Sequence, residues 1–315
     1  MRAVRVIVIG CGVIGITTAL RLRSAGVEVE VWTRDDPAAT TSAAAGAIWY
    51  PFLAEPRDAV ARWSAVTFAR LEEIAADPSA GVRMCSVVEA FDEEAPDLWW
   101  ASAVRGVTML PSREVPDGFR AAARTTVPVC DVPVHLSWLL GEVARAGVEV
   151  VRREVGSLDE GFDHADVVVN CAGLGARELC DDRELSAVRG QVLRLEGVSM
   201  DEAWIDDTDA RPCYIVPRAD SLVVGGTAQA GDERPGVDDE DSDAILAAAT
   251  RSWPALARGR VRDAWVGFRP FRSSVRLEPE RRSGGRLLVH NYGHGGSGYT
   301  VSWGCAEDVA SLITG

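Results

Sequence analysis

Lysine is missing from this sequence, so the 33 basic residues among its 315 positions are all arginine. The absence excludes a lysine Schiff base, and with it pyridoxal phosphate chemistry. It also excludes the lysine of a phosphate-binding P-loop. Seven cysteines occur without any Cys-x-x-Cys spacing, so they indicate neither a zinc site nor a disulfide scaffold. The four histidines lack metal-ligand spacing except for His290 and His294, and we expect no metal site.

Long hydrophobic runs are missing too. No apolar stretch reaches the roughly 18 residues that a membrane-spanning helix needs. The net charge of −14 argues against nucleic acid or an anionic membrane surface as a partner. The apolar start of the chain lacks a small-residue cleavage site, and the final letters, SLITG, are not a peroxisomal address. We therefore expect a cytoplasmic protein.

A strand–turn–helix–strand unit opens the chain. The β-branched run at 4–9 predicts a buried parallel strand, and the apolar spacing after it predicts a helix that stops at Gly26. The run at 27–32 predicts the second strand. Between the first strand and the helix stand Gly10, Gly12 and Gly15 as G-x-G-x-x-G. This context is typical of a dinucleotide site, with a tight turn, a close approach to a pyrophosphate and close helix packing.

The motif by itself fits NAD and FAD equally. A ribose-binding carboxylate is expected about 20 residues after the glycines, and Asp35 or Asp36 fills that role, with Arg34 near the adenosine. A second buried strand runs into a turn at Gly173, and in flavoproteins such a turn supports the same cofactor from another side. Thr41 and Ser42 stand among small residues that let the backbone reach a ring or a phosphate.

The segment 290–300, HNYGHGGSGYT, favours FAD over NAD as the cofactor. Its composition suits neither a packed helix nor a packed strand. Its glycines permit a close backbone approach to a flat tricyclic ring, which NAD does not have. A helix starting near Tyr299 would aim its positive end at the pyrimidine side of that ring.

The order of elements predicts an α/β fold with two interleaved domains. Nucleotide-type units lie at both ends and in the middle, and segments that read as antiparallel strands lie between them. We expect further helices over about 57–76 and 134–147. The expected Rossmann-like FAD-binding domain is discontinuous, and the α+β substrate domain is built on a mainly antiparallel sheet. The boundaries are 1–52, 133–186 and 268–315 for the first domain, and 53–132 and 187–267 for the second.

The chain resembles the FAD-dependent D-amino-acid oxidase family, which includes D-aspartate oxidase. The matching stretches occur in family order and span nearly the whole chain. They are VIVIGCGVIGITTAL, TTSAAAGAIWYPF, VVVNCAGLGA, VRGQVLRLEG, CYIVPR, VGFRPFRSSVRLE and HNYGHGGSGYTVSWGCAEDVASL. The resemblance implies a non-covalent FAD and oxidative deamination. A D-amino acid would give a hydride from Cα to flavin N5, with oxygen as acceptor and hydrogen peroxide as product.

Motif and resemblance together assign the cofactor-binding residues. They lie in the first glycine turn, after the second strand, in the small-residue loop, after later strands and in the glycine-rich segment. They are Gly10, Gly12, Val13, Ile14, Gly15, Arg34, Asp35, Thr41, Ser42, Gly46, Ala47, Val155, Gly173, Arg269, Gly293, His294, Gly295, Gly298, Tyr299 and Thr300.

An amino-acid site needs a partner for the α-carboxylate. The resemblance gives that role to Arg269 with the hydroxyl of Tyr214, because a guanidinium matches a carboxylate as a bidentate fork. It gives the amine to the backbone carbonyl of Gly296. Tyr214 is expected to orient the substrate and not to abstract a proton. The remaining pocket residues are Tyr50, Phe52, Ala228 and Ser297.

Two departures from the family concern substrate entry and choice. Family members of the vertebrate type carry a lid tyrosine where this chain has Ala210, so we expect a short or absent lid and bulky side chains tolerated. A family arginine that holds acidic side chains is replaced by Ala228. Arg211 and Arg218 lie near Tyr214 in the sequence and are candidates to substitute for it. The aromatic wall favours neutral, hydrophobic D-amino acids.

Other readings of the same residues stay open. They are a D-aspartate oxidase, a glycine or sarcosine type of amine oxidase, a flavin dehydrogenase with an acceptor other than oxygen, and a non-enzymatic FAD-binding module. The small-molecule partners expected are a D-amino acid and O2, and a homodimer is left open.

Overall fold

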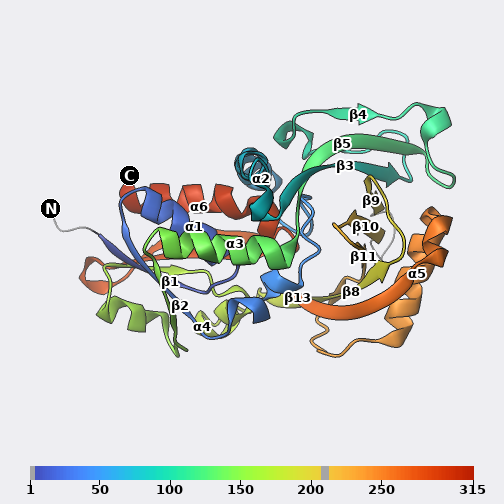
Figure 1. Cartoon of the computed structure of the whole chain (residues 1–315). Helices are drawn as coiled ribbons and strands as arrows, with labels where there is room; N and C mark the ends of the chain where they lie inside the picture. Colours follow the sequence, from blue (N-terminus) through green and yellow to red (C-terminus); the bar gives the residue numbers. More distant parts are fainter. Residues whose placement is uncertain (1–3, 207–212) are drawn as a thin grey trace.

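The computed structural model describes residues 4–206 and 213–315. One continuous sheet runs through them, in the order β4-β5-β3-β9-β10-β11-β8-β13-β14-β7-β1-β2-β6, with β12 paired to β8. Figure 1 shows that the sheet bends into two parts, one carrying α1, α3 and α6 and the other carrying α5. The parallel strands of the first part and the mainly antiparallel strands of the second confirm the α/β fold class.

Parallel strands form the part of the sheet that holds the opening motif. Their core is β-branched and fully buried, as at Val6, Ile7 and Val8, because helices cover both faces of such a sheet. Helix α1 packs against α3 and α6. The strands are β1 (Arg5–Ile9), β2 (Glu28–Thr33), β6 (Glu149–Arg152), β7 (Val167–Asn170) and β14 (Leu287–His294), and the helices are α1 (Val13–Ser24), α3 (Val132–Arg145) and α6 (Gly298–Thr314).

The second part of the sheet is mainly antiparallel, with β3 and β9 as a parallel pair. Helix α5 (Asp239–Ser252) packs on β8, β10 and β11, and its first turn is capped by the side chain of Asp238. The strands are β3 (Val82–Phe91), β4 (Val107–Met109), β5 (Ala121–Cys130), β8 (Ser186–Glu196), β9 (Ala203–Asp206), β10 (Cys213–Pro217), β11 (Leu222–Gly225), β12 (Gln229–Ala230) and β13 (Arg260–Arg281).

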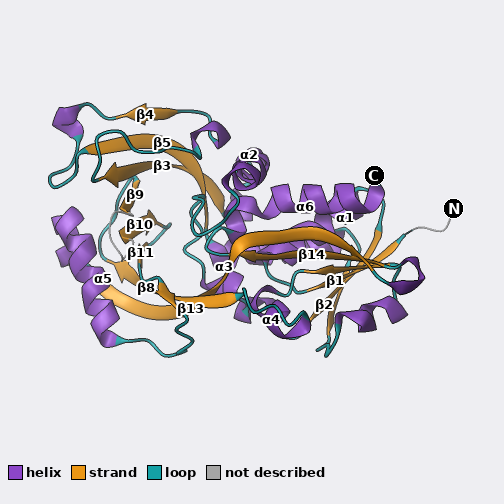
Figure 2. Cartoon of the chain, turned by 180° about the vertical axis from the view of Figure 1, so that it is seen from behind, coloured by secondary structure: helices purple, strands orange, loops and turns teal. Residues whose placement is uncertain are grey.

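Strand β13 joins the two parts. It pairs with β8 from Arg260 to Phe271 and with β14 from Phe271 to Arg281. Seen from behind, in Figure 2, it passes from the side of β8 to the side of β14. Its central residues therefore stand at the junction of the parallel and antiparallel strands.

The remaining helical elements connect these strands. Helix α2 packs against α6, and the short helix α4 follows the turn after β7. Their bounds are α2 (Arg57–Ile74) and α4 (Ala176–Leu179), with 3-10 turns η1 (Pro37–Ala39), η2 (Thr41–Ala44), η3 (Pro78–Ala80), η4 (Ala101–Ala103), η5 (Ser112–Glu114), η6 (Leu158–Asp163), η7 (Gly173–Gly175), η8 (Pro254–Arg258) and η9 (Ser283–Gly285).

The expectation for the segment 290–300 was wrong in its first half. Residues 290–294 form the end of β14 and are buried, although their composition is unusual for a strand. Their polar side chains are satisfied inside the protein: His290 pairs with Glu280 at 3.0 Å, and the amide of Asn291 donates to Thr18 at 3.2 Å. Hydrogen bonding thus compensates the cost of burying them.

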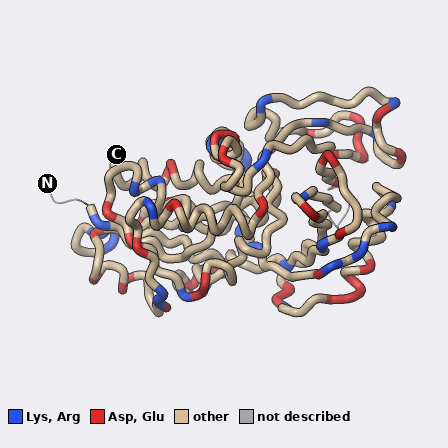
Figure 3. Tube along the Cα trace, in the orientation of Figure 1, with Lys and Arg blue, Asp and Glu red and all other residues tan. Residues whose placement is uncertain are grey.

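Charge and surface agree with the composition. Figure 3 shows arginines and acidic residues interspersed over both parts of the molecule. Within the described ranges, no helix is long and apolar enough to cross a membrane. All seven cysteines are free thiols. The domain boundaries given above stay a prediction.

Candidate active site

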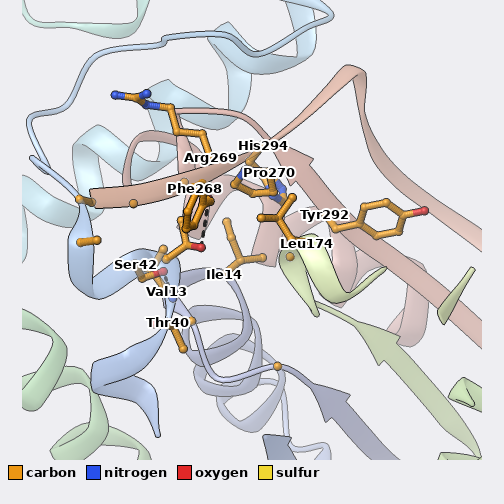
Figure 4. A pocket seen from close by; sticks show the side chains of 18 of the residues that line it. Val13, Ile14, Thr40, Ser42, Leu174, Phe268, Arg269, Pro270, Tyr292 and His294 are labelled. Atoms are coloured by element: carbon orange, nitrogen blue, oxygen red, sulfur yellow. Dashed lines mark hydrogen bonds between the residues drawn. The ribbon is translucent and has the colours of Figure 1, made fainter. Parts of the chain in front are cut away.

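A cavity of about 470 Å³ lies between the two parts of the fold. Its walls come from the β1–α1 turn, the loop that holds η1 and η2, the turn after β7, and the turn between β14 and α6. Strands β8, β10 and β13 close it from the antiparallel side. Figure 4 shows Val13, Ile14 and Ser42 in one region of the wall, with the side chain of Arg269 extending away from them in another.

The three glycines of the first turn have different structural roles. Gly10 has φ +111°, and a Cβ there would lie 2.3 Å from the carbonyl oxygen of Cys171. A Cβ on Gly15 would lie 1.9 Å from the carbonyl oxygen of Gly10, so this glycine serves helix packing and does not line the cavity. Gly12 faces the cavity, where Ser42 Oγ is the nearest atom to its Cβ position, at 3.0 Å. This division is the one that a pyrophosphate-binding turn requires.

The N-terminus of α1 points into this region. Gly12 is its N-cap, and the backbone N–H of Val13 donates to Ser42 Oγ at 2.9 Å. Val13 and Ile14 line the cavity. Backbone N–H groups and the positive end of the helix dipole favour a phosphate at such a position.

At the far end of β2 the two candidate carboxylates differ. Asp35 lines the cavity and pairs with Arg34 at 2.9 Å. Asp36 instead caps η1, accepting from the N–H of Ala38 at 2.8 Å. The placement favours Asp35 as the ribose partner, and Val155 lines the same end of the cavity.

The glycine-rich turn before α6 is tied to two other segments. The N–H of Gly295 donates to Pro270 O at 2.8 Å, and that of Gly296 donates to Phe52 O at 3.0 Å. Gly298 begins α6, and the hydroxyl of Tyr299 donates to Ser42 O at 3.1 Å. The backbone of this turn and its partners therefore form one wall of the cavity.

His294 lines the cavity as a neutral side chain. Burial lowers the pKa of His294 to about 3. Its Nε2–H donates to Asn291 Oδ1 at 3.0 Å, since the amide of Asn291 is itself a donor to Thr18. The imidazole therefore orients this wall and carries no charge at neutral pH.

Arg269 and Tyr214 meet at the antiparallel end of the cavity. The guanidinium of Arg269 donates to Thr227 O at 2.9 Å, and its charge is close enough to the hydroxyl of Tyr214 to act on the pKa of that group. It lies against Gly190, where a Cβ would come within 2.4 Å of Arg269 Nη1. Burial raises the pKa of the Tyr214 hydroxyl, although the neighbouring Arg269 lowers it. The phenol therefore stays protonated at neutral pH and can donate, beside a fixed positive charge.

Aromatic side chains stand beside this pair. The Arg269 guanidinium lies 5.6 Å from the centre of the Phe52 ring. A Cβ on Gly296 would lie 2.7 Å from Phe52 Cδ1, which brings Gly296 to the same corner. Tyr50 also lines the cavity. The structure thus gathers the expected catalytic residues and the two expected aromatic residues in one place.

Five residues expected in the site do not line the cavity. Besides Gly15, these are Ala228, Gly293, Ser297 and Thr300. The Ser297 hydroxyl accepts from the N–H of Phe52 at 2.7 Å and donates to its carbonyl at 2.9 Å. Thr300 makes the same two bonds to the backbone of Tyr50, at 3.1 and 3.0 Å. Ser297 and Thr300 therefore support the cavity wall from outside the cavity. Gly293, at φ +83°, shapes the turn.

The candidate cations for an acidic substrate side chain are placed differently. Arg218 does not line the cavity, because its guanidinium donates to the carbonyl of Gly46 from behind the wall. Ala210 and Arg211, on which the expectation of a missing lid and the other candidate rest, lie outside the described residues.

Sequence reasoning missed several residues of the cavity wall. Arg153 lies over the ring of Trp32 at 4.0 Å, at the end of the cavity near Asp35. The sequence could have indicated Trp32 as a cavity residue, because it stands near the carboxyl end of a parallel strand. Most of the others lie inside stretches that carry the family resemblance but had no role assigned: Cys171, Leu174, Gly190, Val192, Phe268, Asn291 and Tyr292. Glu178 and Ile205 come from segments with no local motif.

Fold and cavity together define a class, the α/β oxidoreductases that bind a dinucleotide at a glycine turn. The cavity walls fit FAD. Gly12 leaves space for the phosphates, and the backbone around Gly46, Gly173 and Gly295 provides small residues along the wall. A Cβ on Gly173, at φ +56°, would meet nothing within 4 Å.

Comparison with known proteins narrows the class. The family model "FAD dependent oxidoreductase" matches residues 5–312. A D-amino-acid oxidase of Rubrobacter xylanophilus is 44% identical over 310 residues, covering 98% of this chain and 95% of the relative. The D-amino-acid oxidase of Dictyostelium discoideum is 37% identical (98% and 91% covered), and the D-aspartate oxidase of Homo sapiens is 34% identical (100% and 96%).

A solved structure supports the fold. The glycine oxidase from Geobacillus kaustophilus superposes with a TM-score of 0.83 at 20% identity, covering 99% of this chain and 95% of that one. The chain belongs to the FAD-dependent D-amino-acid oxidase family. It is an enzyme, and its cofactor is FAD.

Proposed function

We propose that this enzyme oxidises neutral and hydrophobic D-amino acids to 2-oxo acids, ammonia and hydrogen peroxide. The observation that carries the proposal is the pair of Arg269 and Tyr214 in the same cavity as the dinucleotide turn. FAD, which the walls around Gly12 and Gly295 would hold, would supply the redox chemistry, namely acceptance of a hydride from Cα at N5 and reoxidation by oxygen. The amine loses a proton, and the resulting imino acid takes up water to give the 2-oxo acid and ammonia.

The carboxylate is bound by charge and by geometry. Arg269 offers a planar fork, its orientation fixed by Thr227 O, and the protonated Tyr214 offers a further donor. Tyr214 then orients the substrate, since a phenol with a raised pKa is a poor base. The carbonyl of Gly296 is the proposed acceptor for the amine, and it would fix the Cα–H toward the ring.

The rest of the pocket sets the proposed substrate class. Phe52, Ile205 and Val192 line the cavity near the clamp, and each is apolar. Within the described ranges, Arg218 faces the carbonyl of Gly46 and not the cavity. An apolar side chain would therefore lose no hydrogen bonds on entering, whereas a second carboxylate would lose its hydration.

The test is anaerobic mixing of the purified holoenzyme with single amino acids while flavin absorbance is followed. We expect D-alanine and D-methionine to bleach the flavin and L-alanine, glycine and sarcosine to leave it oxidised. Admission of oxygen should restore the colour and release one hydrogen peroxide per substrate. Bleaching only by glycine or sarcosine would refute the proposal, and bleaching without peroxide would point to another electron acceptor.

Two variants test the roles. Arg269→Met keeps the length of the side chain but leaves a buried carboxylate unpaired, which costs about 3–5 kcal/mol, or roughly two to four powers of ten in kcat/KM, mostly through KM. Tyr214→Phe removes one hydrogen bond, so we expect a loss of about tenfold or less. Arg113→Met is the matched control, because the Arg113 side chain is 82% exposed and pairs with its neighbour Glu114. Equal small losses in both active-site variants would contradict the assignment.

Other features of the proposal rest on the sequence. The parallel part of the fold is the proposed FAD-binding domain, and the antiparallel part is the proposed substrate domain. Residence in the cytoplasm stays a prediction, and assembly as a homodimer stays open.

A further inference from the structure

The carboxylate clamp is supported from behind by the segment that joins β11 to β12. In that segment, the carbonyl oxygen of Thr227 accepts a hydrogen bond from Arg269 Nη1 at 2.9 Å. Thr227 is only 3% exposed and does not line the cavity, so its side chain does not touch a molecule bound there. Its effect on a substrate therefore passes through Arg269, which does line the cavity.

Thr227 lies where the pairing along β8 is interrupted. Strands β11 and β12 pair with β8 on either side of the interruption, at Val192 and Arg189. On β8, positions 190 and 191 separate these pairs, whereas positions 226, 227 and 228 of the joining segment lie opposite them. An extra residue on one side of an antiparallel pair disrupts the ladder and changes the direction in which nearby groups point. The carbonyl of Thr227 can therefore point toward Arg269.

The side chain of Thr227 supplies a hydrogen bond at this interruption. Its hydroxyl oxygen accepts from the backbone N–H of Gln191 at 2.9 Å, and its own backbone N–H donates to Gln191 O at 3.3 Å. Thr227 is thus held to β8 at two points. A valine at this position would keep the shape of the side chain but leave the N–H of Gln191 buried without an acceptor, which is unfavourable.

Gln191 is itself fixed on the opposite face of the sheet. Successive residues of a strand point to opposite faces, and the Cβ position of Gly190 faces Arg269. The fully buried side chain of Gln191 donates to Asp238 O at 2.7 Å and to Ser242 Oγ at 2.8 Å, and it accepts from the N–H of Asp238 at 2.8 Å. These bonds tie β8 to the first turn of α5, so the backbone to which Thr227 is bonded has a defined position.

We propose that Thr227 is a positioning residue for the substrate carboxylate: its hydroxyl, bonded to Gln191, fixes the carbonyl that orients the guanidinium of Arg269. The inference rests on the proposed function and deepens it, because it names a residue outside the cavity on which the carboxylate clamp depends. A guanidinium binds a carboxylate through two parallel hydrogen bonds, which require a defined orientation of the fork. Loss of the Thr227 hydroxyl should therefore weaken substrate binding more than it slows the turnover of bound substrate.

The experiment compares two variants of the holoenzyme, Thr227→Val, which lacks the hydroxyl, and Thr227→Ser, which keeps it. In Thr227→Val we expect KM for D-alanine to rise about tenfold, the effect of weakening one hydrogen bond to a charged group, with kcat within about threefold of wild type. In Thr227→Ser both constants should stay close to those of the wild type. Thr108→Val, at an exposed position of β4, is the matched control and should change neither constant.

A second measurement does not depend on turnover. Propionate has the carboxylate and the carbon chain of alanine but no amine, and its Kd can be read from the flavin absorbance during a titration. We expect this Kd to rise about tenfold in Thr227→Val, in parallel with KM, and to stay unchanged in Thr227→Ser. A merely structural defect would instead lower the Tm and the FAD content of Thr227→Val and leave the propionate Kd of its holoenzyme unchanged, and that result would overturn the inference.

Thr227→Ala decides the matter if Thr227→Val does not fold, because alanine leaves the place of the hydroxyl empty and does not fill it with a methyl group. The same rises in KM and Kd are expected. Values within about twofold of wild type in the variants that lack the hydroxyl would overturn the inference, as would equal losses in Thr227→Ser and Thr227→Val. If D-alanine fails to reduce the flavin of the wild-type enzyme, the proposed function fails, and the propionate Kd still decides the role of Thr227.

Discussion

Gly190→Ala tests the carboxylate clamp without replacing a charged residue. Gly190 lies on β8, directly beneath the guanidinium of Arg269. A methyl group there would lie 2.4 Å from Nη1, 2.6 Å from Cζ and 2.6 Å from Nη2 of Arg269. The backbone of Gly190 needs no positive φ, so alanine is compatible with the strand itself. The added methyl acts on Arg269 and not on the fold.

The size of the effect follows from these distances. Ordinary contacts of a Cβ begin at 3.4 Å, so the nearest guanidinium atom must move by about 3.4 − 2.4 = 1.0 Å. Such a shift also strains the hydrogen bond to Thr227 O. A misplacement of about 1 Å in a positioning group can cost about 10²-fold in rate. We therefore expect kcat/KM for D-alanine to fall about 100-fold, with most of the loss in KM.

Steady-state kinetics and a thermal melt of the same preparations measure this. We expect FAD content and Tm to stay close to wild type. Replacing a glycine inside a strand by alanine stabilises the folded state by about 0.5–1 kcal/mol, so the variant should not unfold more easily. Gly106→Ala is the control, since a Cβ at Gly106 meets nothing within 4 Å. If Gly190→Ala retains kcat/KM within threefold of wild type, Arg269 does not hold the substrate in the position proposed.

Two further predictions concern the cofactor turn and a buried carboxylate. Gly12→Ala should weaken FAD binding at least tenfold and leave the Tm of the apoprotein unchanged, because its Cβ meets only the Ser42 side chain. Gly15→Ala should lower that Tm, because its Cβ would lie 1.9 Å from Gly10 O. A lower Tm in Gly12→Ala, together with weaker FAD binding and an unchanged Tm in Gly15→Ala, would contradict these two roles. Asp182→Asn should lower the free energy of unfolding by about 1–3 kcal/mol at neutral pH, by weakening bonds from Tyr292 at 2.6 Å and Arg272 at 3.1 Å. Burial raises the pKa of Asp182, but these bonds bring it below its ordinary value. The stabilisation is therefore present above the unfolded pKa of about 3.9 and is lost as the pH falls through the folded pKa. In urea titrations the difference from wild type should shrink below about pH 4, and a difference that grew there would contradict the assignment.

The cofactor turn could be predicted from the sequence because its determinants are local. The strand, three glycines and a helix follow one another between residues 4 and 24, and the backbone needs of Gly10 and Gly15 arise within that unit and its neighbour β7. The clamp was accessible only through the family resemblance. Nothing in the sequence around Arg269 shows that it lies on Gly190, since the two positions are 79 apart in the sequence.

Strand register accounts for most of what the sequence could not supply. The placement of Thr227 beside Gln191 depends on which residues of β8, β11 and β12 face each other, and no local pattern encodes that pairing. The composition of residues 290–294 was misleading for a related reason. Its histidines and asparagine look solvent-exposed until Glu280 and Thr18, from other elements, are seen to satisfy two of them.

Strand β13 explains how substrate and cofactor can be held in a constant relation. Arg269 pairs with Val188 of β8, and Phe271, two residues further on, pairs with both Ser186 of β8 and His294 of β14. Between them, Pro270 accepts the N–H of Gly295, in the turn that forms the cofactor wall. The clamp is thus one residue away from a hydrogen bond to that wall, along an extended strand that is paired with β8 throughout this stretch. Because hydride transfer requires reacting atoms about 3–3.5 Å apart, a continuous strand between the two sites is a better support than a flexible loop.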